Sequence, residues 1–440
     1  MIRIPRFSPS FSLSELRAAL GWLRAGQDEG AVGRFEQSFA EYIGAKHGVM
    51  VASARMAAHL ILKGWGLQPG DEVLLPGLTY FSIPSIMIAM GVTPVFVDID
   101  PDTYLMDPRD LERKITPRSK VVVPTHLYGF PCPMDPILKL AWATNLKVLE
   151  DCAQATGARY HGKRLGSFGD ATYYTFGLTK NITTLRGGMI TTDDDGLAAF
   201  LRQTLAPHTT LALEPLLKEV AIGSAMMVAT DPRIYPWTLH QAITLSQKLT
   251  GQDLIHERFG EPEVLYTEIP GSFATSKPRG LQGVVGSTQL TRIDMLNGMR
   301  ASHGRYLLEH LSHAPGIKVP KLVDGAEPIF MSFPLQVPNR AEVAQRLLDQ
   351  GVDTSIGYMS SCGSLPIFAG KVRGNCPHAD RVAREILHIP VHPNLNRDSL
   401  TWLAEAVRRA VKPTSSPRTA AESGADSAPA TPAAAGIGAV

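Results

Sequence analysis

The sequence predicts an α/β fold, with a large domain built on a mostly parallel sheet and a smaller α+β domain near the C-terminal end. From about residue 48, short apolar and β-branched runs alternate with helical stretches. The runs are continuously apolar, as in parallel strands whose two faces are both covered by helices. The predicted strands are residues 48–52, 72–75, 93–97, 120–124, 147–149 and 171–175.

The chain also divides into segments of different character. It has 440 residues, of which 44% are hydrophobic, so it can form more than one core. We expect a large domain over residues 1–300 and a small domain over residues 301–411. Residues 206–275, within the large domain, are apolar without strand alternation and predict a mostly helical insertion. Residues 412–440 are rich in Ala, Pro, Ser and Thr and predict a disordered tail.

Composition argues against several classes of function. The formal net charge is only +2 and the basic residues are scattered, so no nucleic-acid partner is expected. The spacing of the four cysteines fits neither a zinc site nor a disulfide framework, and no metal is expected. The chain shows neither a secretory signal nor an apolar run that could span a membrane. We therefore expect a cytoplasmic protein.

A lysine follows one of the predicted strands. Residues 173–181 read Tyr-Tyr-Thr-Phe-Gly-Leu-Thr-Lys-Asn, so Lys180 lies just beyond a loop of hydroxyl-bearing and small residues. Such a loop can bind a phosphate while the amine forms an imine with an aldehyde cofactor. A single lysine is more often an ordinary surface residue, so this motif needs a second observation beside it.

That second observation is an aspartate at the end of another predicted strand. The apolar run Val148-Leu149 leads to Asp151, at the carboxyl end where open α/β sheets bind their ligands. A carboxylate there can keep a pyridine nitrogen protonated, which makes the ring an electron sink. The alternative is an aspartate that caps a helix. Asp151 and Lys180 together indicate pyridoxal 5'-phosphate (PLP), held as a Schiff base on Lys180.

Several further motifs resemble one family. The chain is similar to the DegT/DnrJ/EryC1/StrS aminotransferases, which are PLP enzymes of fold type I and mostly aminate keto-sugars carried on nucleotides. The resemblance covers roughly residues 30–205 and 276–410. The stretches that carry it are residues 33–36, 69–73, 97–100, 126–129, 150–154, 180–184 and 387–393.

The resemblance implies roles for individual residues. Lys180 would be the Schiff-base lysine and proton shuttle, and Asp151 would bind the pyridine nitrogen. Gln154 would lie near the phenolic oxygen of the ring. Tyr80 would stack on the ring, although a tyrosine in the core is the alternative. Thr175 stands where the family has a phosphate-binding serine.

The chain departs from the family at the phosphate loop. Ser53, Ala54 and Arg55 stand where the family usually has Ser-Gly-Thr, at a helix start that can bind an anion. Arg55 could pair with the phosphate or point away from it. Residues 275–277 read Thr-Ser-Lys where the family has Asn-Tyr-Arg, a segment that reaches the phosphate of the partner subunit.

The resemblance favours an aminotransferase that moves an amino group from a small-molecule donor, expected to be glutamate, to a keto-sugar or related ketone. Another PLP reaction, such as sugar dehydration, is an alternative, and so is a non-catalytic scaffold or regulatory relative. Lys180 favours transamination, because dehydratase relatives have histidine at that position. Fold type I implies a homodimer.

The insertion at 206–275 has two interpretations. It could cover the mouth of the active site, or form an apolar surface that receives the acceptor or a membrane-associated partner. Its apolar side chains could instead pack against the main domain as an additional core layer.

Overall fold

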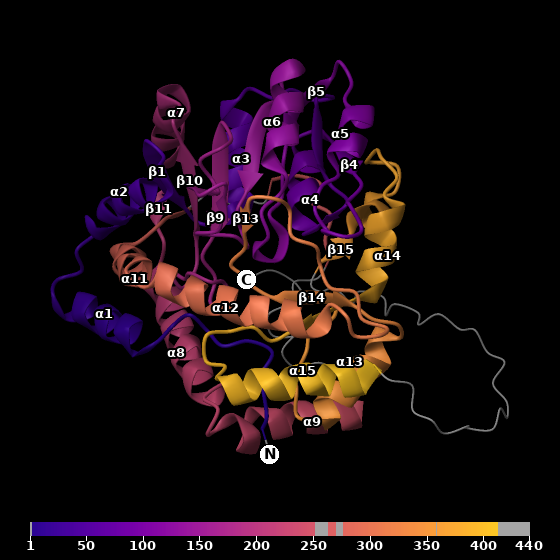
Figure 1. The fold of residues 1–440 in the computed structure, drawn as a ribbon. Helices are drawn as coiled ribbons and strands as arrows, with labels where there is room; N and C mark the ends of the chain where they lie inside the picture. Colours follow the sequence, from indigo (N-terminus) through magenta and orange to yellow (C-terminus); the bar gives the residue numbers. More distant parts are fainter. Residues whose placement is uncertain (1, 251–262, 270–275, 358, 412–440) are drawn as a thin grey trace.

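The computed structural model describes residues 2–250, 263–269, 276–357 and 359–411, and its large sheet confirms the predicted α/β fold (Figure 1). The strand order is β1-β10-β9-β6-β5-β2-β4. Strands from β9 to β4 pair in parallel, whereas β10 is antiparallel to both β9 and β1. The strands are β1 (His47–Val51), β2 (Glu72–Pro76), β4 (Thr93–Val97), β5 (Ser119–Val122), β6 (Lys147–Asp151), β9 (Ala171–Thr175) and β10 (Gly188–Thr192).

Helices pack around this sheet and lead into it. Helix α1 begins with a capping box, in which the Glu15 carboxylate accepts from the Ser12 backbone N–H at 2.7 Å. Helix α2 buries Phe35 and Phe39, which contact strand residues of the core. The helices of this part are α1 (Leu13–Arg24), α2 (Ala31–Ile43), α3 (Ala54–Gly64), α4 (Ser82–Ala89), α5 (Pro108–Lys114), α6 (Met134–Ala143), α7 (Asp195–Leu205) and α11 (Gly280–Leu290).

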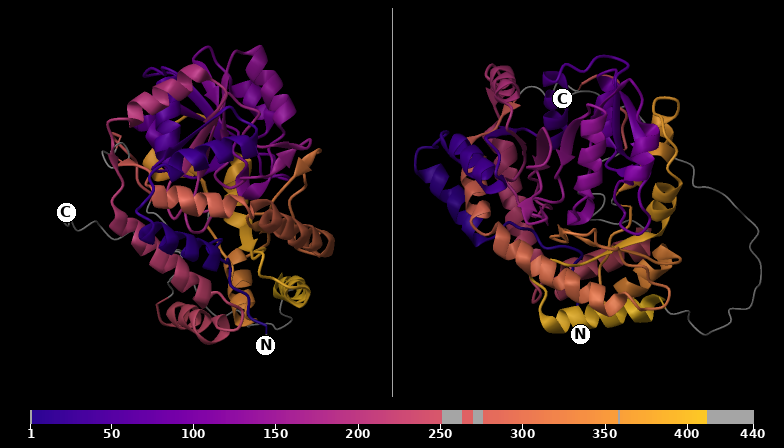
Figure 2. Two further views of the ribbon diagram at one scale, coloured as in Figure 1. Left: turned by 90° about the vertical axis from the view of Figure 1, so that its left-hand side faces the viewer. Right: turned by 45° about the horizontal axis from the view of Figure 1, so that its top comes forward.

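The C-terminal part is an α+β unit below the sheet in Figure 1. Its strands β14 and β16 pair antiparallel, and α12 runs between the sheet and α15 in both figures (Figures 1 and 2). The predicted domain boundary at residue 300 lies within α12, and the division into two domains stays a prediction. The elements are α12 (Ile293–Leu311), β14 (Phe333–Gln336), α13 (Arg340–Asp349), α14 (Pro377–Glu385), β16 (Ile386–Ile389) and α15 (Arg397–Val411).

Short pairings join distant segments. Strand β15 of the C-terminal part pairs with β3, which directly precedes Tyr80. The short elements are β3 (Leu78–Thr79), η1 (Leu127–Gly129), β7 (Arg159–Tyr160), β8 (Lys163–Arg164), β13 (Ala326–Glu327), β15 (Ser360–Ser361), η4 (Cys362–Ser364) and η5 (Pro366–Phe368).

The described part of the insertion is mostly helical, except for the short strand β11 and for residues 263–269, which form neither helix nor strand. Leu216 of α8 is fully buried in a cluster with residues of α1 and α11, and Tyr235 packs with Leu348 of α13. Much of the insertion is therefore an additional core layer, although Trp237 stays 81% exposed. Its elements are β11 (Thr209–Thr210), α8 (Leu213–Ala229), η2 (Tyr235–Trp237) and α9 (Leu239–Thr250), followed by β12 (Ser276–Lys277), which pairs with β11.

Within the described residues, no helix has the length and apolar character needed to cross a membrane. The predicted disordered tail, 412–440, lies outside the described residues.

Candidate active site

The residues singled out from the sequence line one cavity of about 610 Å³. Strands β6 and β9 contribute side chains from their carboxyl ends, as expected for a ligand site in an open α/β sheet. The N-terminal segment and the C-terminal part close other sides of the cavity. The predicted residues in its lining are Lys180, Asp151, Gln154, Tyr80, Thr175, Ser53, Ala54 and Arg55.

Lys180 lies in a turn beyond β9. Its backbone N–H donates to the Gly177 carbonyl at 3.1 Å, and its own carbonyl accepts from the Ser10 hydroxyl at 2.9 Å. The next residue, Asn181, is buried and donates to the Thr156 carbonyl at 2.8 Å. These bonds fix the backbone on both sides of the lysine.

Asp151 is the last residue of β6 and is only 6% exposed. No helix begins after it, so the capping interpretation is wrong; its carboxylate accepts from the Ala153 backbone N–H at 3.0 Å instead. Burial raises the pKa of Asp151, while the Ala153 amide, Tyr173 and the positive charge of Lys180 act in the opposite direction. A cationic group bound beside this carboxyl would favour its charged form.

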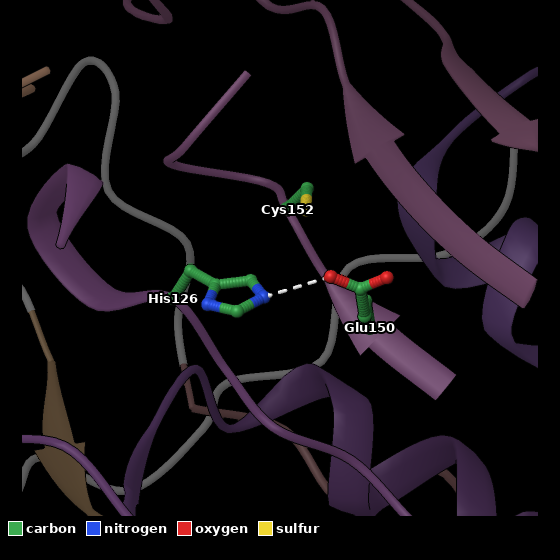
Figure 3. A group of neighbouring side chains, drawn as sticks. All are labelled: His126, Glu150 and Cys152. Atoms are coloured by element: carbon green, nitrogen blue, oxygen red, sulfur yellow. Dashed lines mark hydrogen bonds and ion pairs between the residues drawn. The ribbon is translucent and has the colours of Figure 1, made fainter. Parts of the chain in front are cut away.

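Glu150 and Cys152, the chain neighbours of Asp151, form a buried group with His126 (Figure 3). The Glu150 carboxylate accepts from His126 Nε2 at 3.2 Å and from the backbone N–H groups of Gly166, Phe168 and Gly169. These bonds outweigh burial and lower the pKa of Glu150.

The same three residues have ligand types that suit a metal, but their hydrogen bonds oppose this use. His126 Nδ1 already accepts from the Cys132 backbone N–H at 3.0 Å, so the ring proton lies on Nε2, which donates to Glu150. Burial raises the pKa of the Cys152 thiol well above its usual range, whereas a metal binds the thiolate. The group therefore supports the end of β6, where the backbone N–H of His126 donates to the Asp151 carbonyl at 3.1 Å.

At another end of the cavity, helix α3 points its N-terminus inward. The Ser53 hydroxyl caps this helix by accepting from the Met56 N–H at 3.2 Å. Gly188 of β10 packs closely here, since an added Cβ would lie 2.4 Å from the Tyr174 carbonyl oxygen. Arg55, in the first turn, lines the cavity and donates to the Tyr266 hydroxyl at 3.3 Å. The helix start and Arg55 together form a region suited to an anion.

Gln154 and Tyr80 lie on the remaining walls. The Gln154 side-chain oxygen accepts from the Tyr128 backbone N–H at 2.8 Å, where Tyr128 has a positive φ of 59°. Tyr80 packs against Phe81, with the ring centroids 4.9 Å apart. Both side chains reach the cavity, as the sequence predicts.

Other lining residues were not recognised from the sequence. Arg6 lines the cavity and forms a two-point ion pair with Asp353, at 2.7 and 2.8 Å. His388 is buried, which lowers its pKa to about 3, and its Nδ1 lies 3.1 Å from the Ser332 hydroxyl. Glu263, at the end of the insertion, also lines the cavity. His388 lies within residues 387–393, one of the stretches that resemble the family. No local sequence pattern identifies Arg6 or Glu263 as a cavity residue.

Comparison with known proteins agrees with this architecture. The description of the DegT/DnrJ/EryC1/StrS aminotransferase family matches residues 13–216 and 273–408, and leaves most of the predicted insertion unmatched. The spore coat polysaccharide biosynthesis protein SpsC of Bacillus subtilis is 33% identical, covering 89% of this chain and 92% of that protein. A dTDP-3-amino-3,4,6-trideoxy-alpha-D-glucose transaminase of Streptomyces venezuelae is 30% identical, over 91% and 96%.

One relative has a different kind of name. A pleiotropic regulatory protein of Geobacillus stearothermophilus is 30% identical, covering 86% of this chain and 88% of that protein.

Among solved structures, S. venezuelae DesV in complex with a ketimine intermediate superposes with a TM-score of 0.74 at 28% identity, over 94% of this chain and all of that one. The chain thus belongs to the DegT/DnrJ/EryC1/StrS aminotransferase family and has its fold type I architecture.

Proposed function

We propose that this aminotransferase uses PLP to move an amino group from a small-molecule donor, expected to be glutamate, to a ketone on a sugar. One observation carries the proposal: Lys180 and Asp151, from separate segments of the chain, line the same cavity at the carboxyl ends of parallel strands. An amine and a buried carboxyl in one cavity are the two groups that this cofactor requires.

The remaining residues of the cavity fit the cofactor as well. The N-terminus of α3 and Arg55 suit its phosphate. The Ser82 hydroxyl is 1% exposed, lines the cavity and has no hydrogen-bond partner in the part of the chain that the structure describes. A buried hydroxyl of this kind costs free energy unless a ligand supplies a partner.

Each of the cavity residues would have a different role in the reaction. The bound cofactor supplies a ring that accepts electrons from the reacting carbon. The Asp151 carboxylate would hold the proton on the ring nitrogen. The Lys180 amine would bind the cofactor and then move a proton between the two carbon atoms that exchange the amino group. The Tyr80 ring would keep the cofactor ring in plane, and Thr175 would contribute to the phosphate end.

A keto-sugar is the acceptor that the relatives favour. Two of them are named as transaminases of dTDP-linked amino sugars, and a third as a 3-aminotransferase of a UDP-linked 3-dehydro sugar. The cavity, at about 610 Å³, is in the range of small-molecule sites, roughly 300–1,000 Å³.

A non-catalytic regulatory role is the second candidate, favoured by the name of the Geobacillus relative. The colour of the purified protein separates the two candidates. We expect the protein to be yellow and to lose that absorbance when glutamate is added. A colourless protein to which PLP does not bind would contradict the proposal. A yellow protein that no amino donor bleaches would favour another PLP reaction, such as dehydration.

We also propose a homodimer, as the family resemblance implies. Light scattering at working concentration tests this, and an active monomer would contradict it. A cytoplasmic location is proposed on the same basis, and the four buried free cysteines suit a reducing compartment. Cell fractionation measures that location directly.

A further inference from the structure

The last described part of the insertion, residues 263–269, begins at the cavity, which Glu263 lines. Ser85, fully buried on α4, holds it in place: its hydroxyl donates to the Val264 carbonyl at 3.0 Å and accepts from the Tyr266 N–H at 2.6 Å. Two hydrogen bonds from one buried side chain fix the backbone of Val264–Tyr266 against the large domain.

Side-chain contacts join the same segment to two other parts of the site. The Ser360 hydroxyl, on β15, donates to Glu263 Oε1 at 2.7 Å. The Tyr266 hydroxyl accepts from Arg55, in the first turn of α3, at 3.3 Å. Residues 263–266 therefore connect the C-terminal part, the anion-binding helix and α4 around one opening.

Glu263 places a carboxylate in the cavity lining while its side chain stays exposed to solvent. A carboxylate has about four acceptor positions, so the bond from Ser360 leaves others for a ligand. It accepts hydrogen bonds from hydroxyl groups and repels carboxylates and phosphates. A glutamate-like donor, which carries two carboxylates, is therefore poorly suited to this wall, whereas the hydroxyl groups of a sugar are well suited.

We propose that residues 263–266 form the acceptor-facing wall of the active site, and that the Glu263 carboxylate binds hydroxyl groups of a polyhydroxylated ketone. This rests on the proposed aminotransferase function and names the part of the site that selects the acceptor. Phosphate groups of a nucleotide-linked acceptor would lie away from Glu263. The insertion then contributes to specificity through its end and to stability through its helices.

Titration calorimetry on the protein before any amino donor is added tests the binding step alone, because this form cannot aminate a ketone. The probes are keto-hexoses linked to dTDP, UDP or GDP. We expect Glu263→Ala to weaken the best-bound probe about tenfold, equivalent to about 1.4 kcal/mol. Glu263→Gln, which keeps one acceptor oxygen, should recover part of the affinity. Glu268→Ala is the matched control, since Glu268 is exposed and does not line the cavity.

The two half-reactions separate this proposal from the proposed function. Glutamate should bleach Glu263→Ala at a rate within about twofold of wild type, and 2-oxoglutarate should restore its colour normally, while the keto-hexose restores it about tenfold more slowly. An equal slowing with both ketones, or no change with either, would overturn the role of Glu263. So would a wild-type protein that glutamate bleaches but that binds none of the three sugar probes. A wild-type protein that no amino donor bleaches would instead reject the proposed function, and the calorimetry would still test whether Glu263 contributes to sugar binding.

Discussion

Glu150 tests how the site is supported. The hydrogen bonds that each of its carboxylate oxygens accepts determine how much folding stability is lost when one oxygen is replaced. One carboxylate oxygen accepts from the N–H groups of Phe168 and Gly169, both at 2.8 Å. The other accepts from Gly166 N–H at 2.9 Å and His126 Nε2 at 3.2 Å. In Glu150→Gln, one oxygen becomes an NH₂ group, so two buried donors lose their acceptor in either amide orientation.

The size of the effect follows from this count. A buried donor left unsatisfied costs about 1–3 kcal/mol, so two cost about 2–6 kcal/mol. His126 cannot relieve the loss by exchanging its ring proton, because its Nδ1 accepts from the Cys132 N–H. A loss of this size is a large fraction of the roughly 5–15 kcal/mol that stabilises a typical folded protein.

Denaturant unfolding followed by far-UV circular dichroism measures the loss. The control is Glu112→Gln, because Glu112 is an exposed carboxylate on α5, and its change should stay within about 0.5 kcal/mol. A decrease below about 1 kcal/mol for Glu150→Gln at neutral pH would refute the reasoning.

The effect should also depend on pH, since the folded state lowers the pKa of Glu150. A carboxyl with a lowered pKa contributes stability above its unfolded pKa, about 4.3 for glutamate, and loses it as the pH falls towards the folded value. The difference between wild type and Glu150→Gln should therefore be largest at neutral pH and narrow below about pH 4. A difference that grows on acidification would contradict this assignment.

Three further substitutions test the proposed catalytic groups and the insertion. Lys180→Ala should abolish turnover and the absorbance of the Schiff base with Lys180, even if PLP still binds noncovalently, and wild-type absorbance with activity would reject the assignment. Asp151→Asn should fold normally but lower kcat at least about tenfold, or about 1.4 kcal/mol; a change within about threefold would mean that Asp151 is not the ring partner. Leu216→Ala should lower the unfolding free energy by about 2–5 kcal/mol, because Leu216 is fully buried, whereas Leu217→Ala, at 38% exposure, should cost much less. Equal costs for the two leucines would show that α8 is not packed as described.

The sheet was largely predictable because a strand covered on both faces must be apolar at nearly every position. This rule found β4 and β9 with their observed bounds and placed β6 two residues short of Asp151. It missed β10, a five-residue strand that begins directly after Gly187 and includes two threonines. Strand β10 pairs antiparallel with a neighbour on each side, β1 and β9. The local pattern of apolar residues carries no information about which strands are neighbours in space.

Composition could not decide between the two interpretations of the insertion, because buried helices and an apolar docking surface need the same residues. The structure supports each for a different part. Helices α8 and α9 bury side chains against α1 and α13, whereas Glu263 lines the cavity and the backbone of Val264 and Tyr266 is bound to Ser85. The residues that place the second part there, Ser85 and Ser360, follow no motif, since their hydrogen bonds span 179 and 97 residues of chain.

The same limit applies to the surroundings of Lys180, the proposed catalytic lysine. The motif around Lys180 is local, yet its carbonyl is held by Ser10, 170 residues earlier, and the Ser10 carbonyl in turn accepts from Gln289 at 2.7 Å. Arg300 donates to the Ser10 hydroxyl at 3.2 Å and is buried, which lowers its pKa to about 10. A buried guanidinium needs every acceptor that it has, so Arg300 restrains Ser10, and Ser10 restrains the lysine turn. The backbone of the lysine turn is therefore held by the N-terminal segment and α12, which the local motif around Lys180 does not reveal.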